Sequence, residues 1–161
     1  MPVFKYESHV DAPLDDVWEF HSRIVGLTEL TPGWMRLTVE ATRGPVGEPD
    51  PEILEEGSSV DVSLKPLGVF ARVSWRSVIT ERGCEGDEAY FVDEMSNGPF
   101  KKWKHTHTFE AQGDDRTLMR DRVEYALPLW MLGRAGSPFF RVNAYMMFRH
   151  RHNRTRELLE D

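Results

Sequence analysis

Apolar and polar residues alternate in short runs through most of this chain, and this period of two restricts its fold more than any other feature. Such alternation is typical of β-strands that bury one face. Clusters rich in Gly, Pro, Asn and Asp, which form turns, separate the runs. The seven expected strands cover residues 3–10, 34–42, 59–65, 69–80, 89–95, 103–110 and 117–127.

Helices are expected only near the two ends of the sequence. Asp11 is a suitable N-cap, and Pro13 a suitable first-turn residue, for a short helix directly after the first strand. A second short helix is expected around residues 24–30. From Pro138 to Glu160 the apolar residues return at helical spacing, which predicts one long helix.

Strands linked by hairpins, with helices gathered at the ends, imply an α+β architecture in which the last helix covers one face of an antiparallel sheet. A sheet with this many strands tends to curl. A chain of 161 residues fits one hydrophobic core better than two small ones. We therefore predict a single domain, residues 1–161: a curved sheet of about seven strands around a long C-terminal helix, with a ligand-sized cavity between them.

The charge of the chain argues against nucleic acid as a partner. The 27 acidic residues outnumber the 20 Lys and Arg residues, which gives a net charge of −7. Phosphate backbones and anionic lipids repel such a chain. Its one basic run, residues 149–156, is interpreted as a solvated face of the last helix. We expect no binding of nucleic acid.

Other sequence signals concern the compartment. No apolar run is long enough to span a bilayer, so we expect no insertion into a membrane. The N-terminus shows no secretory signal, and Cys84 is the only cysteine, which excludes an intrachain disulfide. A cytoplasmic location is therefore expected, and the sequence leaves open whether the protein is a homodimer.

Two neighbouring strands carry the candidate catalytic residues. In the run 103–110, Trp103, His105, His107 and Phe109 share one face. On the next strand, Asp121 and Tyr125 lie on the apolar face. If the two strands pair as a hairpin, one or both histidines are cross-strand or diagonal neighbours of Asp121.

A buried carboxylate beside an imidazole is a natural pair for proton transfer, because it fixes the tautomer of the ring and raises its basicity. On this hypothesis His105 or His107 moves a proton on a bound carbonyl compound, Asp121 orients the imidazole, and Tyr125 hydrogen-bonds a ligand oxygen. The alternative is that these groups only satisfy one another in a wet cavity or anchor the sheet.

A metal site is weighed and not assigned. The His-x-His pattern plus a carboxylate could surround one ion, but no third histidine is nearby in sequence. His150 and His152 are two apart on the last helix and face different ways. Asp93 and Glu94 are interpreted as a solvated strand end. We therefore expect no metal and no cofactor.

Bulky apolar side chains supply the walls of the expected cavity. Trp75 lies on an alternating strand face, and its indole N–H needs a partner or a ligand oxygen. The last helix adds an aromatic and Met-rich stripe, which is adaptable enough to line an imperfectly filled space. The residues expected to contact a ligand on these grounds are Trp75, Trp103, Phe109, Tyr125, Phe140 and Met147.

Three segments carry a resemblance to a known superfamily. They are Phe4 through Val10-x-Ala12-Pro13-x-x-x-Val17-Trp18-x-Phe20, then Gly98-Pro99-Phe100-x-x-Trp103-x-His105-x-His107-x-Phe109, and Met119-x-Asp121-x-Val123-x-Tyr125-x-Leu127-Pro128. The chain resembles START-like, polyketide cyclase/dehydrase-like domains of the SRPBCC superfamily along its whole length. The resemblance implies a helix-grip fold. It leaves activity open, because the superfamily includes lipid carriers, hormone receptors and cyclases, which generally work without a metal.

The chain departs from its apparent subgroup after Pro128. Members of the subgroup usually have Gly soon after the final Leu-Pro, whereas this chain continues Leu129-Trp130-Met131-Leu132-Gly133. A bulky Trp130 near the start of the last helix would narrow or cap the mouth of the cavity, so Trp130 joins the expected ligand contacts.

The leading prediction is a protein that binds a small, mostly hydrophobic ligand, such as a lipid, an isoprenoid or an aromatic polyketide-like compound, in an internal cavity. The first alternative is a cyclase or dehydratase that acts on a polyketide-like or aromatic carbonyl substrate through the His–Asp pair. The second alternative is a non-catalytic interaction domain, for which we expect a filled interior. A Gly-rich phosphate loop, a Gly-x-Ser-x-Gly elbow and a Cys-x-x-Cys pair are all missing from the sequence.

Overall fold

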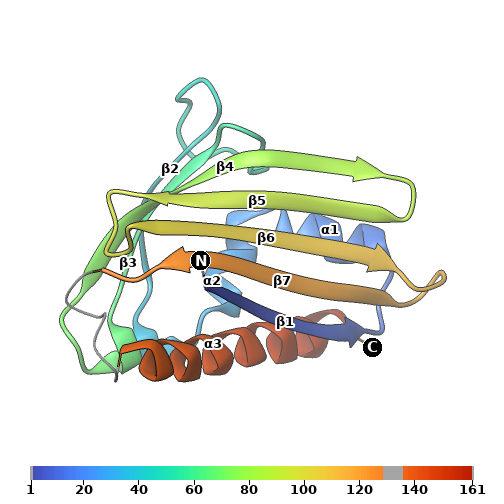
Figure 1. The fold of residues 1–161 in the computed structure, drawn as a ribbon. Coiled ribbons are helices and arrows are strands. Elements are labelled where there is room, and N and C mark those ends of the chain that lie inside the picture. Colours follow the sequence, from blue (N-terminus) through green and yellow to red (C-terminus); the bar gives the residue numbers. More distant parts are fainter. Residues whose placement is uncertain (1, 129–135, 161) are drawn as a thin grey trace.

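The computed structural model describes residues 2–128 and 136–160, in which a seven-stranded antiparallel sheet curls over one long helix (Figure 1). The strand order is β1-β7-β6-β5-β4-β3-β2. The strands are β1 Val3–Val10, β2 Thr38–Arg43, β3 Ser59–Leu64, β4 Val73–Glu85, β5 Glu88–Ser96, β6 Lys102–Ala111 and β7 Thr117–Ala126. The helices are α1 Leu14–His21, α2 Ile24–Leu30 and α3 Gly136–Leu159, with 3₁₀ turns η1 Gly33–Met35 and η2 Pro66–Gly68.

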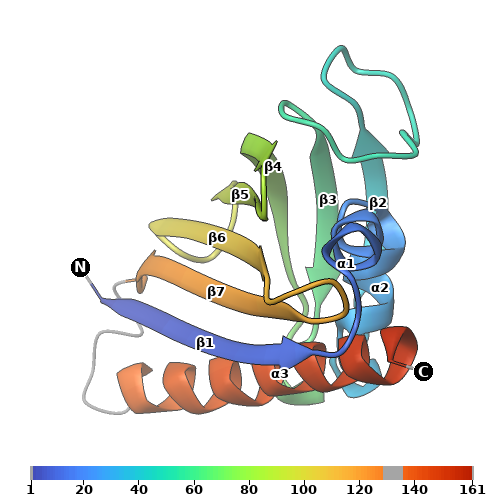
Figure 2. The ribbon, with the colours of Figure 1, turned by 90° about the vertical axis from the view of Figure 1, so that its right-hand side faces the viewer.

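The topology is a six-strand meander to which the first strand is added at one end. Strands β2 to β7 follow one another through hairpins, and β1 pairs antiparallel with β7. Figure 2 shows α3 running under β1, with α1 and α2 between α3 and the β2 edge of the sheet. This architecture confirms the predicted α+β fold with a curved sheet and a long final helix.

The largest core cluster forms where β7 meets α3. Val123, Tyr125 and Phe148 are fully buried there, and Phe140 is nearly so. Phe4 of β1 stacks on Phe148 with ring centroids 5.4 Å apart. Large aromatic rings dominate this packing because each removes a large apolar area from water. The cluster fixes α3 against one half of the sheet and leaves the other half free to border a cavity.

Three local predictions were wrong. Pro13, not Asp11, occupies the N-cap position of α1 and provides no side-chain cap. The expected strand 34–42 begins only at Thr38, because η1 and a left-handed Arg36 precede it. The expected strand 69–80 is displaced to Val73–Glu85, because η2 and the exposed Val69 and Phe70 precede it and the hairpin turn that ends it lies at Gly86, whose φ is 58°. The alternation of apolar and polar residues does not show where a strand ends when the residues on both of its faces are polar.

The described part of the chain contains no helix that is both long and apolar enough to cross a membrane.

Candidate functional site

A cavity of about 820 Å³ lies between α3 and the concave face of the sheet. Its walls come from α2, α3, η2 and strands β3 to β6, and they are mostly apolar. Its size falls within the range of roughly 300–1,000 Å³ that is common for small-molecule sites. Four of the predicted ligand contacts, Trp75, Trp103, Phe140 and Met147, line this cavity.

The other predicted contacts lie elsewhere. Phe109 and Tyr125 are buried in the core and are not among the described residues that line the cavity. The hydroxyl of Tyr125 is buried and has no hydrogen-bond partner within residues 2–128 and 136–160. Trp130 lies outside the described residues.

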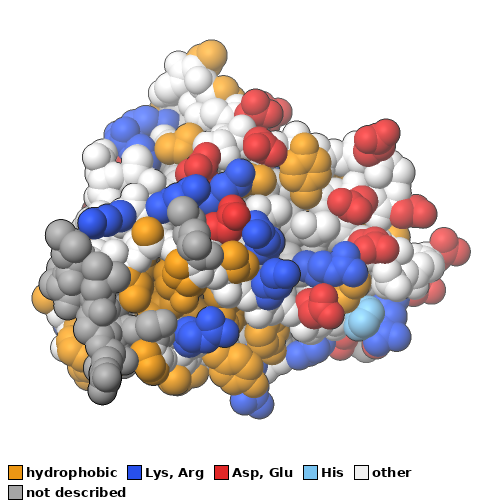
Figure 3. Space-filling model, in the orientation of Figure 1, with side chains coloured by type: hydrophobic (Ala, Val, Ile, Leu, Met, Phe, Trp, Pro, Cys, Tyr) orange, Lys and Arg blue, Asp and Glu red, His pale blue; other side chains and the backbone are white. Residues whose placement is uncertain are grey.

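The cavity reaches the surface near the start of α3. Phe70, after η2, and Phe139, on α3, both line the cavity, yet they are 50% and 39% exposed. Their rings meet edge to face with centroids 5.8 Å apart. Figure 3 shows hydrophobic side chains gathered on this face around the first part of α3, where Val142, Tyr145 and Met146 are also exposed.

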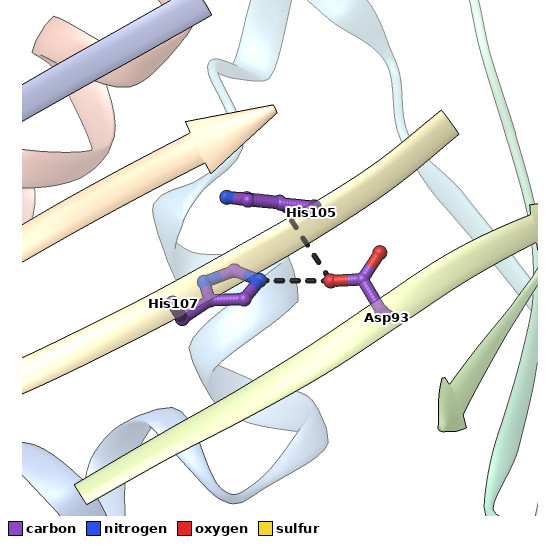
Figure 4. Close-up of side chains that lie close together, drawn as sticks. All are labelled: Asp93, His105 and His107. Atoms are coloured by element: carbon purple, nitrogen blue, oxygen red, sulfur yellow. Dashed lines mark hydrogen bonds and ion pairs between the residues drawn. The ribbon is translucent and has the colours of Figure 1, made fainter. Parts of the chain in front are cut away.

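Two histidines and a carboxylate meet at the polar end of the cavity (Figure 4). Asp93 on β5 is the cross-strand partner of His105 on β6. Its Oδ2 lies 2.8 Å from His107 Nε2 and 3.6 Å from His105 Nδ1. All three side chains line the cavity. The period of two along β6 places both imidazoles on its concave face.

A second carboxylate, Asp121 on β7, lies behind the two histidines. Asp121 is the cross-strand partner of His107, as the strand pattern predicted. Its Oδ1 lies 2.6 Å from His105 Nε2 and 3.2 Å from His107 Nδ1, and its Oδ2 lies 2.5 Å from His152 Nε2 on α3. Ser8 Oγ of β1 lies 2.6 Å from the other ring nitrogen of His152. Asp121 thus joins three imidazoles from two elements.

Burial disfavours the ionised form of both carboxylates, whereas their imidazole partners favour it. Burial alone would raise the pKa of Asp121, but hydrogen bonds from His105, His107 and His152 hold it well below the ordinary value. The pKa of Asp93 is also lowered, because the His107 bond and the neighbouring imidazoles outweigh burial. Both groups are therefore carboxylates at neutral pH.

The two histidines of β6 differ in basicity. Burial and the charge of His107 lower the pKa of His105, with the Asp121 hydrogen bond opposing them. Burial also disfavours a charged His107, but its bonds to Asp121 and Asp93 outweigh burial and raise its pKa. His107 is stacked between Phe91 and His105, with centroids 3.9 Å and 3.6 Å away. Their different surroundings thus make His107 the more basic of the two imidazoles and His105 the less basic.

Arg151 of α3 adds a positive charge to the cavity wall. The side chain is half-buried, and burial lowers the pKa of its guanidinium, opposed by the charges of Asp121 and Asp93. Within residues 2–128 and 136–160, no carboxylate lies within ion-pair distance of this guanidinium. An arginine stays protonated under such conditions. The polar end of the cavity therefore offers the imidazoles of His105 and His107, the Asp93 carboxylate and one cation, and the imidazole of His21 also lines the cavity.

Sequence reasoning missed two members of this cluster. Asp93 was interpreted as part of a solvated strand end, whereas it faces the cavity together with Phe91 and Met95. Their period of two along β5 was the signal. His152 was compared only with His150, although Phe148, four residues earlier on the same helix, faces the core.

Comparison with known proteins places the chain in a family. The model of the family described as "Polyketide cyclase / dehydrase and lipid transport" matches residues 10–149. The chain belongs to this family. A comparison with curated protein sequences gives no match.

Several solved structures share the fold of this family member, although their sequences are only distantly similar. A START superfamily protein from Mycobacterium smegmatis superposes with a TM-score of 0.66 at 16% identity, covering 98% of this chain and 97% of that one. Norcoclaurine synthase from Thalictrum flavum, a point mutant in complex with a transition state analogue, gives 0.68 at 18%, covering 98% and 92%. Major latex-like protein 151 from Panax ginseng gives 0.65 at 10%, covering 99% and 98%. These likenesses support the helix-grip fold.

Proposed function

We propose that this protein binds one small, mostly hydrophobic molecule with an oxygen-bearing end, of the lipid, isoprenoid or aromatic polyketide class. The observation that carries the proposal is the cavity of about 820 Å³, whose walls are mostly apolar and include a cluster of polar groups at Asp93, His105 and His107. Apolar walls favour the body of such a molecule, and a few polar groups orient it. The family to which the chain belongs includes lipid transport in its description.

The polar end indicates how the ligand is oriented. Arg151 faces the cavity and is able to donate hydrogen bonds to an oxygen, and the imidazoles of His105 and His107 border the same end. Arg151 favours a ligand with an acidic group, because a cation beside an apolar space gains most from an anionic partner. The apolar part of the ligand would then extend along Trp75 and Met147 toward the opening.

A second candidate, a cyclase or dehydratase, is favoured by the same imidazoles. His105 and His107 differ in basicity and border the cavity, so one is suited to accept a proton and the other to donate one. Asp121 would position both rings from behind without touching the ligand. A filled interior, which we expected for a pure interaction domain, does not agree with the cavity.

The test of binding uses the neutral fluorescent probe N-phenyl-1-naphthylamine and a variant that fills the cavity. Ala144 is buried on α3 and lines the cavity, so Ala144→Phe places a ring inside it. Overpacking costs about 1–3 kcal/mol, so we expect probe affinity to fall at least about fivefold. Val142→Phe, on the exposed side of the same helix, is the matched control and should bind like the wild type.

Thermal melts of both variants show whether they fold. Native mass spectrometry of the gently purified protein should also reveal a bound apolar molecule near one-to-one occupancy. A wild-type protein that neither binds the probe nor carries any molecule would overturn the proposal. Conversion of a recovered ligand by the wild type, absent in His107→Ala, would favour the enzyme over the carrier.

A further inference from the structure

Three electron-rich atoms converge at the polar end of the cavity. They are Asp93 Oδ2, His107 Nε2 and His105 Nδ1, which lie within 4.8 Å of one another. The carboxylate oxygen is 2.8 Å from the first nitrogen and 3.6 Å from the second. Figure 4 shows the two imidazoles and the carboxylate directed toward one another from β6 and β5.

The tautomers follow from the carboxylate behind the rings. A carboxylate accepts hydrogen bonds only, so in the metal-bound arrangement the ring nitrogens that face Asp121 Oδ1 carry the protons. These are Nε2 of His105 and Nδ1 of His107. In neutral imidazoles the opposite nitrogens then present lone pairs, and both are directed at the Asp93 carboxylate.

With both rings in this tautomer, a cation among the three atoms would balance their lone pairs and the charge of the Asp93 carboxylate. One proton on His107 Nε2 would satisfy its contact with Asp93. His105 Nδ1 would still have no hydrogen-bond partner in the described part of the chain, because its 3.6 Å separation from Asp93 is too long. A metal ion would satisfy all three atoms at once.

We propose that Asp93, His105 and His107 bind one divalent transition-metal ion at the polar end of the cavity. Bonds of about 2.0–2.2 Å to nitrogen and oxygen place adjacent ligand atoms roughly 3–3.5 Å apart, and the Asp93 oxygen lies 2.8 Å and 3.6 Å from the two nitrogens. Asp121 holds both imidazoles in the tautomer that a metal requires, which is the usual role of a carboxylate behind ligating histidines. His152 and Ser8 fix Asp121 in turn.

The donor set defines the class of ion. Two imidazole nitrogens and one carboxylate oxygen suit Zn²⁺, Fe²⁺, Co²⁺ or Ni²⁺, whereas Mg²⁺ and Ca²⁺ prefer oxygen ligands alone. The three protein ligands leave further coordination positions, and the cavity borders all three residues. An oxygen of a cavity ligand or a water molecule would occupy such a position. The ion does not depend on which hydrophobic molecule the cavity holds.

The test is metal binding to the whole protein. Protein purified without chelators is assayed for bound metal by mass spectrometry, then stripped and titrated with Zn²⁺ by calorimetry and with Co²⁺ by visible absorption. We expect close to one ion per chain at micromolar protein, with Co²⁺ bands of low coordination number. Asp93→Asn and His105→Ala should weaken binding by more than the roughly 10–100-fold that is typical of losing an outer carboxylate.

The matched control is His9→Ala, which removes an exposed histidine on β1 and should bind Zn²⁺ like the wild type. Circular dichroism and binding of N-phenyl-1-naphthylamine show whether each variant keeps its fold and its cavity. A wild type that binds Zn²⁺ no more tightly than Asp93→Asn would overturn the metal site and leave His107 Nε2–H as a simple hydrogen-bond donor to Asp93. The probe assay reports separately on the hydrophobic cavity, so one proposal can fail while the other stands.

Discussion

Arg151 is the residue whose environment says most about the chemistry of the ligand. It lines the cavity on the α3 side, and the described part of the chain provides no ion pair for its guanidinium. Its neighbour Arg149 is exposed to solvent on the same helix. A cation that faces an apolar space without a partner is costly, and a bound anion would remove that cost.

We expect Arg151→Met to weaken binding of dodecanoate while leaving dodecan-1-ol almost unaffected. A hydrogen bond to a charged group contributes about 1.5–3 kcal/mol, which corresponds to roughly tenfold or more in Kd. Displacement of N-phenyl-1-naphthylamine measures both ligands, and Arg149→Met serves as the control. Equal losses for the acid and the alcohol would show that Arg151 packs against the ligand and does not pair with its acidic group.

At the residue scale, the sequence predicted three of the five members of the polar cluster. The pattern of β6 and β7 was sufficient to bring His105, His107 and Asp121 together, because cross-strand pairing in a hairpin follows from alternation. Asp93 shares the alternating face of β5 with Phe91 and Met95 and could have been assigned from that pattern, whereas His152 depends on the rotation of α3, which long-range packing decides. Alternation along one strand does not contain that information.

Among the elements, β2, β3 and β4 are joined by a charged row on the sheet. Asp61 of β3 is the cross-strand partner of Arg76 on β4, whose Nε lies 2.7 Å from its Oδ1. Arg43 at the end of β2 reaches the other oxygen at 2.8 Å. Arg76, followed by Arg43, lowers the pKa of Asp61 from 3.8 to about 2.

We expect Asp61 to titrate near pH 2 in the folded protein, as followed by NMR of its carboxyl carbon. Because the folded pKa lies below the unfolded one, the ionised group stabilises the fold fully above about pH 4, and this contribution is lost as the pH falls through 2. Arg76→Gln should move the midpoint up toward 3.8. Arg122→Gln, whose partner is Glu124 on β7, should leave it unchanged. An unchanged midpoint in Arg76→Gln would contradict the assignment.

Element boundaries were predictable where one strand face is buried and uncertain where both faces are polar. The alternation of β1 gave its bounds, Val3–Val10, because Phe4 and Val10 are buried at its two ends. The start of β4 was misplaced, since Val69 and Phe70 are apolar but exposed near the opening of the cavity. An exposed apolar pair has the same sequence pattern as a strand, and only the tertiary structure distinguishes them.

At the scale of the whole molecule, a cavity of this size leaves its apolar lining side chains without packing contacts that a bound ligand would supply. A ligand that binds only the folded state stabilises it by about 2.7 kcal/mol at a concentration of one hundred times Kd. For a chain of this length, that corresponds to a rise in Tm of roughly 5–10 °C.

We expect such a rise with saturating dodecanoate, as measured by scanning fluorimetry or calorimetry, and little rise in Ala144→Phe, whose cavity is filled. The Val142→Phe control should respond like the wild type. The same shift in all three proteins would mean that the fatty acid stabilises the surface and not the interior.

The hydrogen bonds of Asp121 have a consequence for how the molecule is made. Ser8, Asp121 and His152 belong to the first strand, the last strand and the final helix. During synthesis, both the polar cluster and one wall of the cavity stay incomplete until α3 docks. A nascent chain that holds only the sheet would expose its concave apolar face to any hydrophobic molecule nearby. For the ligand proposed above, selective binding therefore requires that α3 be translated and docked first.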